Sequence, residues 1–116
     1  MQYKQFEIIV TEVPFIDDRE KSKVRPAVVI SSDEYNKQTG FIIVAMITSA
    51  KHSKLWNDIP ITDPEAIGLK EPSIVRMKFT NILASEVLAK IGVLDSKNQS
   101  ALEEKVKACI LPPVKK

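Results

Sequence analysis

The sequence predicts a mainly β domain, a small barrel or sandwich with short helices, followed by one C-terminal α-helix. Short runs rich in Val and Ile recur along residues 6–94, and Pro, Gly, Asp and Asn bound them. The runs are spaced at roughly 10 to 15 residues, which is typical of small β-barrels and sandwiches rather than of a parallel α/β sheet. After residue 95 the apolar residues change to helical spacing.

The expected strands are short and follow one another without a linker. They cover residues 6–13, 26–32, 41–49, 58–63, 73–82 and 89–94. The fifth alternates between two faces, with Ile74, Arg76, Lys78 and Thr80 on one and Val75, Met77 and Phe79 on the other.

The C-terminal helix is expected to begin after Asp95 or Ser96, either of which can cap it, and to end before two prolines. Its apolar stripe consists of Leu102, Val106, Cys109 and Ile110. Such a stripe predicts packing on the domain itself. A partner-binding helix is the alternative.

Length and composition narrow the class of protein. A chain of 116 residues predicts one domain, residues 1–116, with a single core. One cysteine, Cys109, cannot form an intramolecular disulfide. No apolar run approaches the roughly 18 residues of a membrane span, so we expect no membrane partner and a cytoplasmic protein. The net charge of +2 is too small by itself to imply a nucleic-acid partner.

The positive charges gather where turns are expected. The first cluster is Arg19, Lys21, Lys23 and Arg25, the second Lys51, His52 and Lys54, and the third Lys70, Arg76 and Lys78. Any one such cluster is ordinarily a solvated loop. Three together predict a basic face if the fold brings them to one side. Arg25, one residue before Pro26 and a strand, is either solvated or held rigidly by the strand end.

Several common chemistries leave no trace in the sequence. It contains no P-loop, dinucleotide fingerprint or Gly-x-Ser-x-Gly elbow. His52 has no second His or carboxylate at a ligand or triad spacing. We therefore expect no metal site and no cofactor.

The order of several short motifs resembles the PemK/MazF family of bacterial toxins from toxin–antitoxin modules. The motifs are "VPFIDD", "RPAVVISSDEYN", "FIIVAMITSA", "GLKEPSIVR" and "IGVL" before a final helix, over about residues 6–110. The resemblance implies an SH3-like barrel with short helices and a C-terminal helix. It also implies a sequence-selective, metal-independent endoribonuclease that cleaves single-stranded RNA, leaving a 2′,3′-cyclic phosphate and a free 5′-hydroxyl.

The resemblance also assigns roles to individual residues. Arg25 matches the Arg before Pro, and its guanidinium would stabilise charge on the scissile phosphate. Thr48 matches the Thr at the end of the central strand, and its hydroxyl would donate to a phosphate oxygen and orient the 2′-hydroxyl. RNA-binding roles are expected for the neighbouring polar and basic residues Lys21, Lys23, Ser49, Arg76 and Lys78. The implied partners are RNA, a cognate antitoxin and a second copy of the chain.

Two departures from the family pattern carry expectations of their own. Phe6-Glu7 replaces the usual Gly-Asp or Gly-Glu, which predicts a different local turn. Lys78 stands where some members carry a catalytic Asp, and a charged ammonium cannot accept a proton. Either the chemistry rests on Arg25 and Thr48, or this copy is weakened.

Other readings of the sequence remain open. Trp56 could stack on an RNA base, receive an antitoxin side chain or close one end of the barrel. The whole chain could also be a non-catalytic SH3-like module that binds nucleic acid or protein, or a toxin of the same barrel directed at gyrase.

Overall fold

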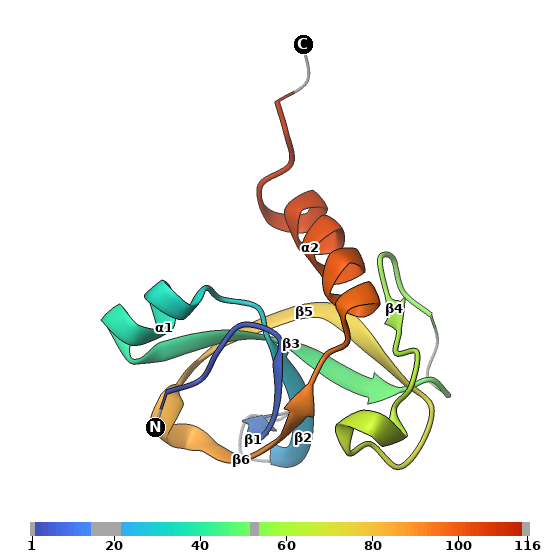
Figure 1. Cartoon of the computed structure of the whole chain (residues 1–116), viewed down its shortest axis with the longest axis horizontal. Coiled ribbons are helices and arrows are strands. Elements are labelled where there is room, and N and C mark those ends of the chain that lie inside the picture. The colour runs from blue at the N-terminus through green and yellow to red at the C-terminus, as the bar shows by residue number, and fades with distance from the viewer. Residues whose placement is uncertain (1, 15–21, 52–53, 115–116) are drawn as a thin grey trace.

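The computed structural model describes residues 2–14, 22–51 and 54–114, and within them six strands form one antiparallel sheet. Neighbouring strands follow the order β4-β5-β3-β2-β1-β6. Their bounds are β1 Glu7–Pro14, β2 Ser22–Val29, β3 Phe41–Ser49, β4 Ile59–Pro60, β5 Ser73–Leu83 and β6 Val87–Val93. The long strands curve around a common interior (Figure 1). The predicted mainly β, barrel-like fold is confirmed.

The two faces of the sheet carry separate apolar cores because side chains alternate along each strand. The first core includes Ile8, Val28, Ala45, Ile47 and Val75, together with Leu102 of the C-terminal helix. The second core includes Ile9, Ala27, Val29, Val44 and Met46. Met77 and Phe79 pack against the first core beside Val75, as the alternation in β5 predicted. Each face of the central strands is therefore fixed by burial.

The C-terminal helix α2, Ser96–Ile110, contacts β4 and β5. Asp95 is its N-cap, and the Asp95 side chain accepts a hydrogen bond from the Asn98 N–H at 2.8 Å. Leu102 is buried and Val106 packs against the first core, so the helix does pack on its own domain. Ile110 is 49% exposed, so the packed stripe does not extend to the last residue of the helix.

Asn98 also explains why β4 is shorter than the predicted residues 58–63. Its side-chain amide donates to the Pro60 carbonyl at 3.2 Å and accepts from the Thr62 N–H at 3.0 Å. Pro60 has no N–H to offer to a ladder. The Ile61 N–H still donates to the Ser73 carbonyl at 3.0 Å, and from Thr62 on the segment is tied to α2 by the Asn98 side chain instead of by strand pairing.

A short helix, α1 at Asp33–Thr39, occupies a segment for which no element was predicted. Ser32 caps it by accepting a hydrogen bond from the Tyr35 N–H at 3.1 Å, and Gly40 ends it with φ 74°. Asn36 faces the interior, and its amide donates to the Tyr3 carbonyl at 3.0 Å. The helix is therefore anchored to the N-terminal segment.

The edges of the curved sheet approach each other through a 3-10 turn, η1 at Glu65–Ile67, which follows β4. This turn contacts β6 at the opposite edge. A Cβ added to Gly92 in β6 would lie 3.0 Å from the Ile67 Cα. Gly92 therefore permits a close backbone approach that brings the two edges together.

One sequence expectation about local backbone is revised, and the backbone at Phe6 bears on a second. Strand β2 begins at Ser22 rather than at Pro26, so Arg25 lies within the strand and is not a loop residue. Phe6 has φ 73°, in the left-handed region that favours glycine. Phe6 thus adopts a backbone conformation that a glycine would adopt without strain, and the expected difference from the family's turn stays a prediction.

No helix among the described residues has the length and apolar character needed to cross a membrane.

Candidate active site

Arg25 and Thr48 come from adjacent strands and lie at equivalent positions. In the ladder between β2 and β3, Ala27 pairs with Met46 and Val28 pairs with Ala45. The ladder stops after Ala27, since Pro26 has no N–H to donate. Carried two residues further, the same register places Arg25 opposite Thr48, and opposed residues of an antiparallel pair share a face.

A groove with a volume of about 440 Å³ contains both side chains. Arg25 and Thr48 are each partly buried there. The polar residues that line the groove with them are Ser49, Lys70, Glu71 and Ser73, and its apolar walls are Val24, Pro26, Ile47 and Leu69. The groove thus combines cations, hydroxyl groups and one carboxylate, which are the groups that can bind and activate a phosphodiester.

The floor of this groove is held by the junction of β3 and β5. Ser49 pairs with Ser73, and Thr48 pairs with Ile74. The Ala50 N–H donates to the Pro72 carbonyl at 2.9 Å, and the Ser73 hydroxyl donates to the Glu71 carbonyl at 2.8 Å. The segment before β5 is therefore fixed beside the end of β3, where Thr48 lies.

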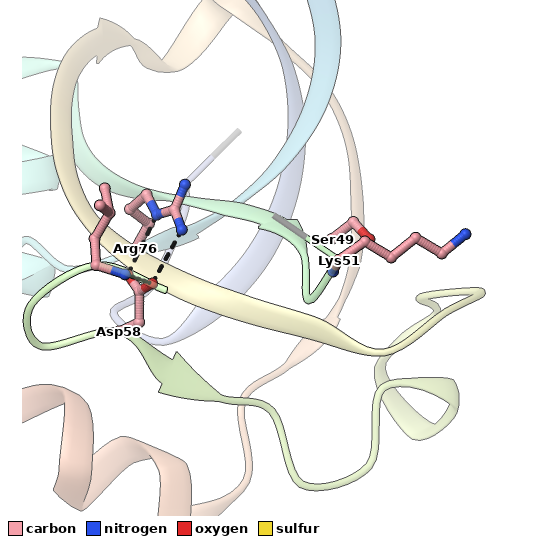
Figure 2. A network of polar contacts seen from close by, with 5 residues as sticks. Ser49, Lys51, Asp58 and Arg76 are labelled. Atoms are coloured by element: carbon pink, nitrogen blue, oxygen red, sulfur yellow. Dashed lines mark hydrogen bonds and ion pairs between the residues drawn. The ribbon is translucent and has the colours of Figure 1, made fainter. Parts of the chain in front are cut away.

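Arg76 lies elsewhere and forms an ion pair with Asp58. Its Nη2 is 3.0 Å from Asp58 Oδ2, and its Nε donates to Asp58 Oδ1 at 3.3 Å. Asp58 Oδ2 also accepts a hydrogen bond from the Leu55 N–H at 2.7 Å. The Arg76 side chain is 19% exposed and the Asp58 side chain is 1% exposed. Figure 2 shows this pair well apart from Ser49 and Lys51 at the end of β3.

The electrostatics of the pair favour the ionised form of Asp58. Burial alone would raise the pKa of this carboxyl. The hydrogen bonds from Arg76 and the Leu55 N–H, together with the charge of Arg76, outweigh burial and hold the pKa of Asp58 below its usual 3.8. Asp58 is therefore a structural anion for Arg76.

A second groove of about 550 Å³ lies between β5, α2 and the turn before β4. Its lining includes Trp56, Arg76, Lys78, Phe79 and Cys109. Trp56 is 70% exposed, so it does not close an end of the barrel, and its two predicted binding roles stay predictions. Asn57 in this turn has φ 66°, in the left-handed region, and the Asp58 N–H donates to the Leu55 carbonyl at 3.2 Å.

Comparison with models of known protein families identifies the family of this chain. Residues 4–110 match the family described as PemK-like, MazF-like toxin of type II toxin–antitoxin system. This chain belongs to that family of toxins. A comparison of the sequence with curated proteins finds no match.

Solved structures of related toxins share the fold of this one. Mycobacterium tuberculosis toxin MazF-mt6 superposes with a TM-score of 0.69 at 21% identity, over 88% of this chain and 93% of that chain. A mycobacterial endoribonuclease in complex with its cognate antitoxin gives a TM-score of 0.75 at 9% identity, over 97% and 99%. A MazE–MazF structure from Deinococcus radiodurans gives 0.71 at 15% identity, over 95% and 97%.

The predicted site residues of this toxin divide between the two grooves. Arg25, Thr48 and Ser49 line the first, whereas Arg76 and Lys78 line the second. Lys23 has its backbone in β2 opposite Val13. Lys21 and His52 lie outside the described residues. Within the described part of the toxin, no three His, Cys, Asp or Glu side chains gather closely enough to hold a metal ion.

The sequence analysis counted Lys70 in the third basic cluster but assigned neither Lys70 nor Glu71 to the first groove. Both stand in the motif "GLKEPSIVR", which was used only to identify the family. Their place becomes visible once the register between β3 and β5 is known, because Ser49 pairs with Ser73 two residues after Glu71.

Proposed function

We propose that this toxin is a sequence-selective endoribonuclease that cleaves single-stranded RNA without a metal ion, through a 2′,3′-cyclic phosphate. The observation that carries this proposal is the shared groove of Arg25 and Thr48, two residues 23 positions apart in sequence that β2 and β3 bring to one face. Family membership supports the same reaction class.

In the proposed reaction, the RNA backbone lies along the groove with the scissile phosphate between β2 and β3. The Arg25 guanidinium binds two phosphate oxygens and stabilises the negative charge that develops on phosphorus. The Thr48 hydroxyl donates to a non-bridging oxygen and holds the 2′-hydroxyl in line with the leaving 5′-oxygen. The Ser49 hydroxyl oxygen accepts a hydrogen bond from the Lys51 N–H at 3.2 Å. The Ser49 hydroxyl group is assigned as a hydrogen-bond donor to the RNA.

The basic residues outside the first groove extend the binding surface. Lys21 and Lys23 are assigned to phosphates on the side of Arg25, and Lys78 to phosphates beyond β5. Arg76, which is also assigned to RNA, lies beside Lys78 in the second groove with its guanidinium held by Asp58, so its charge is balanced within the pair. The segment between Lys51 and Glu65 is the part of the chain assigned to reading RNA bases.

The proposed protein partners follow from the related structures, two of which contain a toxin with its antitoxin. We assign this toxin a cognate antitoxin with an acidic segment that folds into the basic groove and blocks RNA. A second copy of the chain completes the RNA path as a homodimer. A monomer mass at micromolar concentration by light scattering would contradict the dimer.

The test is cleavage of a mixed-sequence single-stranded RNA by the purified toxin in excess EDTA. Arg25→Ala and Thr48→Ala are compared with Lys97→Ala, which removes an exposed charge from α2, far from the groove in the sequence and outside its lining. Mass spectrometry identifies the product ends. We expect cyclic-phosphate and 5′-hydroxyl ends from the wild type and Lys97→Ala, and a loss of about 100-fold or more in the two groove variants.

The alternatives give different results in the same experiment. RNA that is bound but intact at every toxin concentration indicates a non-catalytic binding module. Intact RNA combined with inhibition of a topoisomerase indicates a protein-directed toxin. Cleavage that survives both groove substitutions would show that the reaction uses another site.

A further inference from the structure

Attack of the RNA 2′-oxygen on the scissile phosphorus is assisted by a group that accepts the proton of the 2′-hydroxyl. In the first groove, Arg25 and Lys70 are cations, and Thr48, Ser49 and Ser73 carry hydroxyl groups. Glu71 is the one carboxylate among the described residues that line it. Among the residues that the structure describes in this groove, Glu71 is therefore the candidate proton acceptor by residue type.

The position of Glu71 is fixed by hydrogen bonds to its own segment. The Ser73 hydroxyl donates to the Glu71 carbonyl at 2.8 Å, and the next carbonyl, that of Pro72, accepts from the Ala50 N–H at 2.9 Å. Ala50 follows Thr48 by two residues, so the Glu71 backbone is tied to the strand end that presents Thr48. A proline after Glu71 further restricts this backbone. The side chain remains exposed and available to a substrate.

Asp58, the carboxylate paired with Arg76 beside the second groove, cannot perform this role. Asp58 is 1% exposed, and its two oxygens accept hydrogen bonds from Arg76 and the Leu55 N–H. Lys78, where some family members carry an acid, lines the second groove. The described lining of the second groove therefore contains no carboxylate that could take the place of that acid.

We propose that Glu71 is the general base of the cleavage reaction, an inference that rests on the proposed ribonuclease function. Its carboxylate takes the 2′-hydroxyl proton as the O2′–P bond forms and the P–O5′ bond breaks. The leaving 5′-oxygen takes a proton from water, and the resulting hydroxide recovers the proton from Glu71. No oxidant or reductant is needed. The charged groups that line the groove with Glu71 are Arg25 from β2 and Lys70 from its own loop.

The experiment measures single-turnover cleavage of a short RNA that contains the site mapped for the wild type, across a pH series. Glu71→Gln and Glu71→Asp are compared with Glu65→Gln, which neutralises an exposed carboxylate of η1 outside the groove. We expect Glu71→Gln to lose about 100-fold or more in rate and to lose the rise of rate with pH on the acid side. Glu71→Asp keeps that rise at a lower rate, and Glu65→Gln matches the wild type.

Binding and folding controls separate proton transfer from other effects. Affinity for the same RNA with a 2′-deoxy nucleotide at the scissile position should change by less than about threefold in Glu71→Gln, because the base acts only during the reaction. Thermal unfolding should match the wild type, since Glu71 is exposed. A Glu71→Gln variant that cleaves at the wild-type rate, or more slowly with an unchanged pH profile, would overturn the inference while leaving the ribonuclease function intact. Failure of the wild type to cleave would overturn both.

Discussion

Arg76 holds Asp58 through two hydrogen bonds, 3.0 Å from Nη2 and 3.3 Å from Nε, at a place where the Asp58 side chain is almost fully buried. The pair joins β5 to the turn that carries Trp56, because Asp58 also accepts from the Leu55 N–H. A buried charge is costly when its partner is removed. The arrangement therefore predicts a role in stability that is separate from cleavage.

The first prediction concerns the loss of one partner. Arg76→Met should lower the free energy of unfolding by about 3–5 kcal/mol, because it leaves the Asp58 carboxylate buried without its counter-ion. The double variant Arg76→Met/Asp58→Leu should recover much of this loss, since no uncompensated charge remains. Urea denaturation measures both values. Equal stability of the single variant and the wild type would contradict the structural role of the pair.

The second prediction concerns acid. The pKa of Asp58 is lower in the folded chain than its usual 3.8, so the unfolded chain binds more protons between the two values and stability rises with pH there. The contribution of ionised Asp58 is present above the unfolded value and is lost as pH falls through the folded value. Asp58→Asn removes this titration.

Urea midpoints at several pH values measure that contribution. The free energy of unfolding of the wild type should exceed that of Asp58→Asn by a constant amount near neutral pH. This difference should become smaller below about pH 4. Other carboxylates titrate in both proteins and cancel in the difference. A difference that stays constant down to pH 2 would show that Asp58 is not the titrating group.

The sequence predicted the parts of this fold that depend on local pattern. The β3 strand has its predicted bounds at residues 41–49 because Val- and Ile-rich runs pack on both faces, and α2 begins after a predicted Asp95 cap. The signals for α1 were also present, with Ser32 as a cap, acids in the first turn and Gly40 after the end. The sequence analysis does not predict α1 because its expected strand at residues 26–32 includes Ser32, the residue that caps the helix.

The parts that could not be predicted depend on contacts between distant segments. Polar residues at the start of β2 become a strand because they pair with β1, as Lys23 does with Val13. Arg76 pairs with Asp58, which lies 18 positions earlier in the sequence, and no sequence pattern links the two residues. Arg25 and Thr48 were linked in the sequence only through resemblance, and Glu71 is seen to line the same groove only in the folded structure.

The third prediction concerns the left-handed backbone at Phe6. Its φ of 73° strains a residue with a Cβ by roughly 1–2 kcal/mol, while its ring packs partly against the first core. Phe6→Ala loses the ring contact and keeps the strain, whereas Phe6→Gly loses the contact and relieves the strain. Phe6→Gly should therefore be more stable than Phe6→Ala by about 1 kcal/mol in urea unfolding. The opposite order would show that the backbone there is not left-handed in solution.

The fourth prediction concerns the close approach of η1 and β6. A Cβ at Gly92 would meet the Ile67 Cα at 3.0 Å and the Ile67 carbonyl oxygen at 3.2 Å. Gly92→Ala must therefore push backbone against backbone, and we expect a loss of about 1–3 kcal/mol in urea unfolding.

Gly40→Ala is the matched control for that loss, because a Cβ there meets nothing within 4 Å and the cost comes from its φ of 74° alone. The two variants also differ in where they loosen the chain. Hydrogen exchange in Gly92→Ala should rise in β6 and around Ile67, at the meeting of the sheet edges, whereas in Gly40→Ala it should rise at the end of α1. Unchanged exchange in β6 of Gly92→Ala would mean that the edges do not meet there, and that the sheet is more open than its curvature indicates.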